Sequence, residues 1–557
     1  MTPLTWEVLE PRLTALVDRP LDADGVPQFL FDVDAIEREV WEAYAGLSRA
    51  KDEDTADEAA KAAYLGFVSE VLPRIEPLSD ALNRKLLAVD GYAPPAALAQ
   101  AWGAMRDAVA LYRDANVPLQ AEEAALRQRF GEIAGRTRVL LDGQELTLAA
   151  ARAKLEEPDR DLRERAWRAI EAGKEAQRTD LDTLFLEFAR LRQAIARNAD
   201  LPDYRAFQWR AMHRHEYTPD DALALHEAVA QEVVPRLRAR REARRRRMGL
   251  DTLRPWDLQA DPEGRPPLKP FADVAELERG LVRMFAALDP ELGADFEMLL
   301  DGWMDLEPRA NKVPGLGYQS YFPVSKRPYI YWSAVGTDDD LLTMRHEAGH
   351  AFHSLATERA WPLLKHGVDR MEVAELASFG MELLTLPVLE RARGGFYDAA
   401  DAKRSEALLL DRVFGLLVSI CQIDAIQHWI YQQPAESLTV EGIDAAWDAI
   451  AERFDTGVDW SGLGRARTKG WHVIHLFQFP FYYLEYGLAY LGALQLYERA
   501  LRDPAEALAG YKRMLGLGGT RPIDALFAAA GLEFGFDRPL VARLAELVSR
   551  RLAEEEG

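Results

Sequence analysis

Cysteine is almost absent from this chain of 557 residues, since Cys421 is its only one. A single cysteine forms no internal disulfide and supplies no thiolate set for a structural zinc, so nothing requires an oxidising compartment. Long apolar runs are missing too. The best candidate, ALLLDRVFGLLVSIC, contains Asp411 and Arg412 and is typical of a buried helix, because a membrane span needs about 18 to 20 apolar residues.

Excess positive charge is also lacking. The formal net charge is −23 and the pI is near 5.0, a balance that repels nucleic acid and anionic membranes. The basic run RLRARREARRRRMG (236–249) has no interleaved aromatic residues and is typical of a solvated helix face. The N-terminal MTPLTWEVLEPRL does not resemble a secretory signal. We therefore expect a cytoplasmic protein without a nucleic-acid or membrane partner, and its oligomeric state is left open.

Helix-forming residues dominate the rest of the sequence. Apolar positions recur every three or four residues, as in 161–199, so the fold class is expected to be mainly α. Two β segments interrupt this pattern. One is a hairpin near 137–148 around Asp142-Gly143, a pair suited to a type I′ turn, and the other is an aromatic-rich stretch at 315–336.

Histidine is scarce, with ten in the chain, yet three fall within eight residues of LLTMRHEAGHAFHSLA (341–356). Each buried imidazole needs partners for two ring nitrogens, so this grouping favours a metal site over a plain core. His346 and His350 project from one helix face, and Glu347 between them is placed to touch a water on the ion. This is the H-E-x-x-H zinc motif. The preceding TDDD (337–340) is expected to cap the helix.

A catalytic zinc needs a third protein ligand. His353 would lie along the same straight helix and converge poorly with the other two. The metzincin pattern is excluded, because its further Gly and His positions hold His353 and Ala356. A carboxylate on a second helix remains, and residues 369–386 offer three glutamates on one face that could otherwise form a solvated stripe: Glu372, Glu375 and Glu382.

HEAGHAFH, followed 25 residues after His350 by Glu375 and seven residues later by Glu382, resembles the hallmark of the oligoendopeptidase F and thimet oligopeptidase family of zinc metallopeptidases. Other segments look like bacterial members, among them LRPWDL, NKVPGLGYQSYFP and HLFQFPFYYLEYGLAYLGALQLY. The resemblance covers most of the chain, more weakly before residue 130. It implies a large two-lobed helical metallopeptidase with a deep central substrate channel and a small β segment next to the zinc-binding helix.

The resemblance also implies an activity and a set of roles. The chain is expected to be a zinc-dependent endopeptidase that hydrolyses internal bonds of short oligopeptides. One Zn²⁺ would be held by His346, His350 and Glu375, with Glu347 as general base. His353, Glu372 and Glu382 are candidates to support the ligands. Residues 1–200 are expected to form an N-terminal helical region and 201–557 the catalytic region.

The segment HLFQFPFYYLEY (475–486) offers donors for the oxyanion, and packing in an aromatic core is its alternative role. If Pro480 starts a helix, two of its tyrosines share one face, and the histidine before the proline sits on a loop that can close over substrate. The candidate donors are His475, Tyr482, Tyr483 and Tyr486.

The substrate backbone is expected to pair with an edge of PYIYWSAVG (328–336), with the segment from Gly315 to Tyr318 closing over it. The residues expected to contact substrate are Gly315, Gly317, Tyr318, Tyr331 and Ser333.

Three other functions stay open at this point. A carboxypeptidase or dipeptidyl carboxypeptidase could use the same zinc site, and it would need a cationic group for the terminal carboxylate of its substrate. A helical peptide-binding relative without turnover is disfavoured by the intact Glu347. A nucleic-acid-binding role for the arginines of 236–247 is the most distant. His213 and His215 match no metal motif and are expected to be structural.

Overall fold

A computed structural model of the chain describes residues 4–309, 311–313, 316–367 and 370–556. Helices make up most of this part of the chain, and its strands form two small sheets, so the expected mainly α class is confirmed. Within these ranges, no helix combines the length and the apolar character that a membrane crossing needs.

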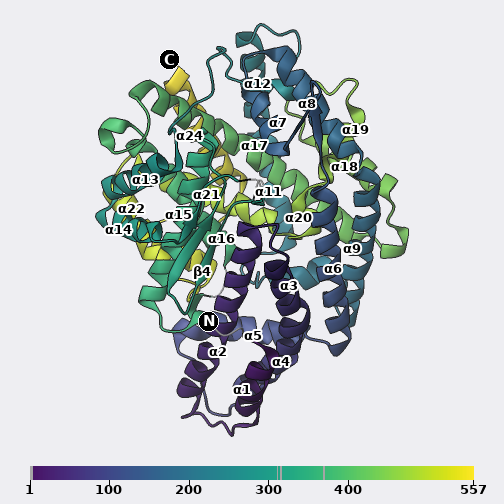
Figure 1. Cartoon of the computed structure of the whole chain (residues 1–557), viewed down its shortest axis with the longest axis vertical. Helices are drawn as coiled ribbons and strands as arrows, with labels where there is room; N and C mark the ends of the chain where they lie inside the picture. The colour runs from purple at the N-terminus through teal and green to yellow at the C-terminus, as the bar shows by residue number, and fades with distance from the viewer. Residues whose placement is uncertain (1–3, 310, 314–315, 368–369, 557) are drawn as a thin grey trace.

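The first helices pack around an apolar core of their own, which includes Phe29, Phe67 and Trp102. They lie together at the lower end of the view in Figure 1. Arg38 fastens this group to the rest of the molecule, because its Nη1 donates to Glu358 Oε2 at 3.0 Å. The helices are α1 (Trp6–Asp18), α2 (Val26–Glu53), α3 (Glu58–Gly66), α4 (Leu72–Leu87) and α5 (Ala99–Leu111).

The main core is continuous across residue 200, the expected boundary between the N-terminal and catalytic regions. Phe185 and Phe188 lie before this position, and their rings pack 5.3 and 6.0 Å from that of Phe477, centroid to centroid. The division at residue 200 therefore stays a prediction. The helices of the first half are α6 (Val117–Ala134), α7 (Leu148–Ala153), α8 (Arg160–Glu175), α9 (Arg178–Asn198), α10 (Tyr204–Ala211), α11 (Pro219–Glu232), α12 (Val234–Arg247), α13 (Val274–Leu288) and α14 (Pro290–Glu297).

The second half of the chain adds the helices that carry the conspicuous histidines, glutamates and tyrosines. Figure 1 shows α15, α16 and α21 close together, and the structure packs α16 against both of the others. These helices are α15 (Asp338–Ala360), α16 (Met371–Leu384), α17 (Ala399–Gln432), α18 (Val440–Arg453), α19 (Gly464–Thr468), α20 (Ile474–Phe477), α21 (Tyr483–Ala500), α22 (Pro504–Leu515), α23 (Ile523–Ala529) and α24 (Arg538–Glu556).

The first sheet is an antiparallel hairpin of β1 (Val139–Leu141) and β2 (Gln144–Leu146). Asp142 and Gly143 connect the strands with φ of 50° and 82°. Two successive left-handed residues suit a type I′ turn, in agreement with the turn chemistry of the Asp-Gly pair.

The second sheet has the order β3-β5-β4, formed by β3 (Met304–Asp305), β4 (Tyr318–Phe322) and β5 (Arg327–Tyr331). The expected pairing of substrate with the segment 328–336 is wrong, because that segment is already bonded on both sides. β4 pairs with it along one edge, and on the other the N–H groups of Trp332 and Ala334 donate to Asp305 and Leu306. β3 and β4 are the two edge strands of this sheet as described, so β4 has one edge without a strand partner.

Gly349 allows α15 and α16 to approach closely. A Cβ atom at this position would lie 2.5 Å from the carbonyl oxygen of Ala377 and 2.6 Å from the Cα of Ser378. Backbone atoms cannot move aside as a flexible side chain can. A glycine is therefore required where the two helices cross, and the crossing sets the distance between their polar side chains.

We expect Gly349→Ala to push α15 away from α16 and lower the free energy of unfolding by about 1 to 3 kcal/mol, as overpacking of a core does. Thermal unfolding measures this change. Gly415→Ala on α17 is the matched control, because no atom lies within 4 Å of its added Cβ and alanine favours a helix. Equal unfolding temperatures for Gly349→Ala and the unaltered protein would contradict the packing argument.

Candidate active site

α15 begins with the expected cap. The Thr337 hydroxyl accepts from the Asp340 N–H at 3.2 Å, and the Asp340 carboxylate accepts from the Thr337 N–H at 2.8 Å. This capping box fixes the helix start and satisfies two backbone donors. The prediction that TDDD caps the helix is confirmed, and the histidines follow on its middle turns.

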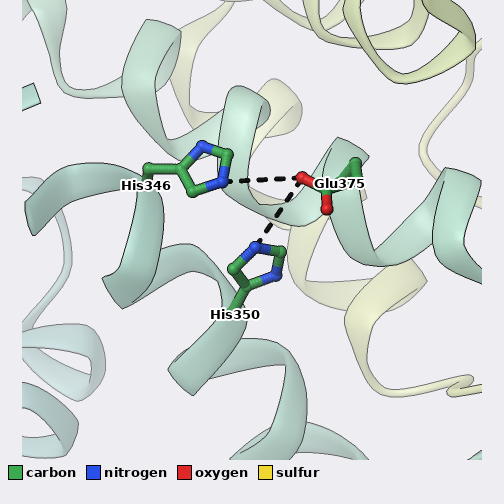
Figure 2. Close-up of side chains that lie close together, drawn as sticks. All are labelled: His346, His350 and Glu375. Carbon is green, nitrogen blue, oxygen red and sulfur yellow. Dashed lines mark ion pairs between the residues drawn. The ribbon is translucent and has the colours of Figure 1, made fainter. Parts of the chain in front are cut away.

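Three side chains converge between α15 and α16 (Figure 2). The Nε2 atoms of His346 and His350 lie 3.5 and 3.7 Å from Oε2 of Glu375, and the ligand atoms of all three lie within 4.8 Å of one another. Ligands bound tetrahedrally at 2.0 to 2.1 Å from zinc are about 3.4 Å apart. Two imidazoles and one carboxylate are also one of the donor sets of catalytic zinc sites. The residues present therefore fit a zinc ion.

Two of the three candidate ligands, His346 and Glu375, are oriented by a further side chain. Nδ1 of His346 lies 2.8 Å from Oε1 of Glu382, which leaves Nε2 to face Glu375. The other carboxylate oxygen of Glu375, Oε1, accepts a hydrogen bond from the hydroxyl of Tyr482. Such contacts fix the ring and carboxylate orientation that a metal needs. The expectation that Glu382 supports a histidine agrees with this geometry.

Burial shifts the pKa values of all three residues of the trio. Burial lowers the pKa of His346, but the hydrogen bond and charge of Glu382 outweigh it and raise that pKa to about 9. Burial, followed by the charge of His346, lowers the pKa of His350 well below its ordinary value. Burial also raises the pKa of Glu375. Charged groups so poorly solvated are costly unless a cation lies among them.

Glu347 lies beside the trio without belonging to it. Its side chain is buried, and burial raises its pKa to about 7, with His346 opposing the shift and Glu375 adding to it. The backbone of Gln319 on β4 hydrogen-bonds to this carboxyl. A carboxyl group that titrates near neutrality can both accept and return a proton, as a general base must.

A cavity of about 700 Å³ opens above these residues. Its lining includes the trio and Glu347, residues of β4, and Tyr482 and Tyr486. Trp41 and Tyr44 of α2 also line it, so the N-terminal helices complete the site. A smaller cavity of about 270 Å³ adjoins it, where Glu347 faces His475, Tyr483, Tyr486 and Arg412.

The histidine and tyrosines of 475–486 all lie near the trio, but the local structure differs from the one expected. His475 belongs to the short helix α20 and not to a loop, and the next helix, α21, begins at Tyr483 and not at Pro480. The ring of His475 stacks on that of Tyr483 at 4.0 Å, centroid to centroid. Tyr486 lines both cavities, whereas Tyr482 is hydrogen-bonded to Glu375.

Several residues expected to bind substrate have other positions. Tyr331 is fully buried and its hydroxyl donates to the carbonyl oxygen of Asp52 at 2.7 Å, so its predicted contact with substrate is wrong. Ser333 lies outside both cavity walls as far as the described residues define them. Gly317 and Tyr318 line the main cavity, and Gly315 lies outside the described residues.

Two of the expected supporting residues do not hydrogen-bond to a ligand. Glu372 accepts instead from the hydroxyl of Tyr217 at 2.7 Å, so direct support of a ligand by Glu372 is wrong. His353 lines the main cavity, and its Nε2 has no hydrogen-bond partner among the described residues. His213 and His215 both bind Asp107, in agreement with a structural role.

The sequence does not indicate the cavity-lining residues that lie far from the histidine motif along the chain. Trp41 and Tyr44 precede the histidine motif by about 300 residues and carry no motif of their own. Gln319 and Tyr321 lie in the expected aromatic β segment, and both line the main cavity. The lining includes consecutive residues of β4, so an alternating pattern along the strand would not have indicated them.

Comparisons with known proteins agree with this geometry. A model of peptidase family M3 matches residues 153–546. The plasmid-encoded oligoendopeptidase F of Lactococcus lactis subsp. cremoris is 27% identical over 261 residues, 46% of this chain and 41% of that protein. An oligoendopeptidase F homologue of Lactococcus lactis subsp. lactis is 25% identical over 342 residues, 60% and 54% of the two chains. The chain thus spans about half the length of these curated relatives.

Solved structures share the fold over nearly the full chain. PZ peptidase A with inhibitor 2 has a TM-score of 0.90 at 23% identity and covers 99% of this chain and 98% of that one. Oligoendopeptidase-F from Enterococcus faecium has a TM-score of 0.67 at 16% identity and covers 99% and 97%. The family expected from HEAGHAFH and its spacing to Glu375 is confirmed.

Zinc binding by the metal-free protein should depend on pH. His346, whose pKa is about 9, carries a proton at neutral pH that the metal must displace. The apparent affinity should therefore fall roughly tenfold for each pH unit below 9. Competition with a chromophoric chelator between pH 6 and 9 measures it. In Glu382→Gln the zinc affinity should begin to fall only at a lower pH, because the carboxylate that raises the pKa of His346 is gone. A flat profile in the unaltered protein would contradict the proton competition.

Proposed function

The chain belongs to peptidase family M3, and we propose that it is a zinc-dependent endopeptidase that hydrolyses internal bonds of short oligopeptides. The observation that carries this proposal is the convergence of His346, His350 and Glu375 beside the buried Glu347, at the floor of one cavity. When bound by the three ligands, a zinc ion supplies Lewis-acid chemistry: it polarises a carbonyl group and acidifies a water molecule.

Glu347 supplies the proton transfers. Its carboxylate takes a proton from the attacking water and then delivers it to the nitrogen of the departing amine. A pKa of about 7 suits both steps, because a group that titrates near the working pH is neither too weak a base nor too weak an acid. Burial also keeps bulk water from competing for that proton.

The unpaired edge of β4 is the place where the substrate backbone binds. Peptides commonly add a strand to an exposed edge, and Gln319 of β4 already faces Glu347 through its backbone. Gly317 and Tyr318 lie at the start of this edge and would contact the peptide beside the cleaved bond. A cavity of about 700 Å³, bounded by β4 and α2, suits an extended peptide of a few residues.

Tyr486 and His475 are the proposed donors to the oxyanion. Tyr486 lines both cavities, and its hydroxyl carries no charge of its own to desolvate. Burial lowers the pKa of His475 to about 4, so this ring is neutral at pH 7 and donates through one nitrogen. Tyr482 has a different task, because its hydroxyl already holds Glu375.

The alternative carboxypeptidase mode needs a free cation for the terminal carboxylate. Arg370 is the basic side chain of the main cavity wall as described, and it donates to His213 and pairs with Glu216. Arg412 in the smaller cavity pairs with Asp339. Both cations are engaged, which favours cleavage at internal bonds.

We further propose that the protein acts in the cytoplasm on peptides alone. The net charge of −23 disfavours nucleic acid and anionic membranes as partners. The basic run forms α12, where Arg245 and Arg246 both pair with Glu242 of the same helix and Arg240 pairs with Asp411 on α17. These internal pairs support a structural role for the run.

A mixed peptide library tests the function. Incubation with the purified protein, followed by mass spectrometry, should show cuts at internal bonds that a chelator abolishes and zinc restores. Glu347→Gln is the matched control: it should keep zinc but lose at least about 10² in kcat, because it lacks the base. Removal of C-terminal residues alone would favour the carboxypeptidase mode. Absence of cleavage, or full activity of Glu347→Gln, would contradict the proposal.

Loss of an oxyanion donor should lower kcat and leave KM nearly unchanged, because that bond strengthens only as charge develops. We expect Tyr486→Phe and His475→Ala each to lose about 10² to 10³ in kcat. Tyr483→Phe is the matched control, because the Tyr483 hydroxyl is bonded to Ser419. Steady-state kinetics on one cleaved peptide measure these changes. A normal kcat in the first two variants would show that the segment only packs.

A further inference from the structure

The backbone just before Tyr482 is held in an unusual conformation. Phe481 has φ of +63°, in the left-handed region that residues with a side chain seldom adopt. Both of its backbone polar groups are bonded to buried side chains: the N–H donates to Oε1 of Gln427 at 2.6 Å, and the carbonyl accepts from Nη2 of Arg214 at 2.7 Å. A conformation of this kind persists only when its surroundings determine it strongly.

Burial of the Arg214 guanidinium in this position costs free energy. Its side chain is fully buried, and Nε and Nη1 have no hydrogen-bond partner among the described residues, although the guanidinium lies 4.4 Å from the ring centroid of Trp209. Its Nη2 also reaches Oε1 of Glu485 at 3.1 Å, on the first turn of α21. Buried arginines are weak evidence for stability as such. The directional bonds of Arg214 go to the residues on either side of Tyr482.

The loop that carries Arg214 is bonded to the ligand helix as well. The hydroxyl of Tyr217 donates to Glu372 on α16 at 2.7 Å, one turn before Glu375. Arg370, at the start of α16, donates to the carbonyl oxygen of His213 at 2.7 Å. One short loop, residues 213–217, therefore connects the helix that bears Glu375 with the turn that bears Tyr482.

We propose that Arg214 is a positioning residue for the hydrogen bond between Tyr482 and Glu375. By holding the Phe481 carbonyl and the Glu485 carboxyl, it fixes the turn so that the Tyr482 hydroxyl meets Oε1 of Glu375. That contact leaves Oε2 directed at His346 and His350. The inference rests on the proposed function only in taking Glu375 as the zinc ligand.

A role of Arg214 in stability alone would affect zinc binding differently from a role in positioning Tyr482. If Arg214 only stabilised the core, its loss would lower the unfolding temperature, and its effect on zinc would add to that of Tyr482. If it acts through Tyr482, its effect on zinc vanishes once the hydroxyl is removed. A double-mutant cycle separates these cases, because residues that act as one unit are not additive.

The test compares Arg214→Met, Arg214→Lys, Tyr482→Phe and the double variant Arg214→Met/Tyr482→Phe, using zinc affinity from chelator competition. Tyr482→Phe should weaken zinc binding about tenfold, and Arg214→Met by a similar factor, as loss of a ligand's support does. The double variant should bind no more weakly than Tyr482→Phe. Arg214→Lys should recover part of the loss, because an ammonium can still donate to the Phe481 carbonyl.

Arg163→Met is the matched control. Arg163 is also buried, donates to the carbonyl of Trp256 at 3.0 Å and pairs with Asp257, and it does not line either cavity. Its loss should lower the unfolding temperature and leave zinc affinity unchanged. Hydrogen exchange followed by mass spectrometry adds a readout independent of metal: residues 478–486 should exchange faster in Arg214→Met and not in Arg163→Met.

Three outcomes would overturn the inference: zinc losses that multiply in the double variant, unchanged exchange of 478–486 in Arg214→Met, or zinc affinity in Tyr482→Phe equal to that of the unaltered protein. Failure of the proposed function is seen separately. A protein that binds zinc but cleaves no peptide would contradict the peptidase activity, while the affinity and exchange measurements would still decide the role of Arg214.

Discussion

The crossing of α15 and α16 at Gly349 is the constraint on which the site depends. It brings Glu347, Glu375 and Glu382 into one buried space with His346 and His350, where burial is the largest cause of the raised pKa of Glu347 and of Glu375. Several carboxylates so close together, with so little solvent, oppose one another. A divalent cation bound among them would offset this repulsion. The packing that raises these pKa values would therefore favour a bound cation, as the proposed function requires.

The glutamates of α16 share one face but have different partners, and their differences come from the elements opposite. Glu375 faces α15 and Tyr482, Glu382 meets His346, and Glu372 lies against Tyr217. A periodicity of three and four residues places them together but does not distinguish a ligand from its neighbours. The distinction is made by α15, by the turn before α21 and by the loop 213–217, all distant in sequence.

The parts that the sequence predicts are those set by local chemistry. Helical periodicity, the Thr337 cap and the Asp142-Gly143 turn depend on neighbouring residues, and the histidine pair needs only one helix. Identification of Glu375 rested on the resemblance to a family, since three glutamates were equally placed by geometry. The errors concern long-range order. Strand order is not legible in an aromatic run, so the sequence does not show that Tyr331 is buried in the sheet. Pro480 does not fix where the next helix starts, and His475 lies on a helix instead of the expected loop.

The cavity also depends on contacts that are distant in sequence, because an N-terminal helix forms part of its lining. Trp41 and Tyr44 of α2 face the cavity, and Arg38 on the same helix is bonded to Glu358, near the end of α15. α15, the helix that carries His346 and His350, is therefore also the helix to which α2 is fastened. In the proposed function, a peptide would lie between α2 and β4, since residues of both line the cavity. An extended chain could pair with the free edge of β4, whereas the strands of a folded domain are already paired with one another. On this proposal, the attachment of α2 would limit the size of the substrate.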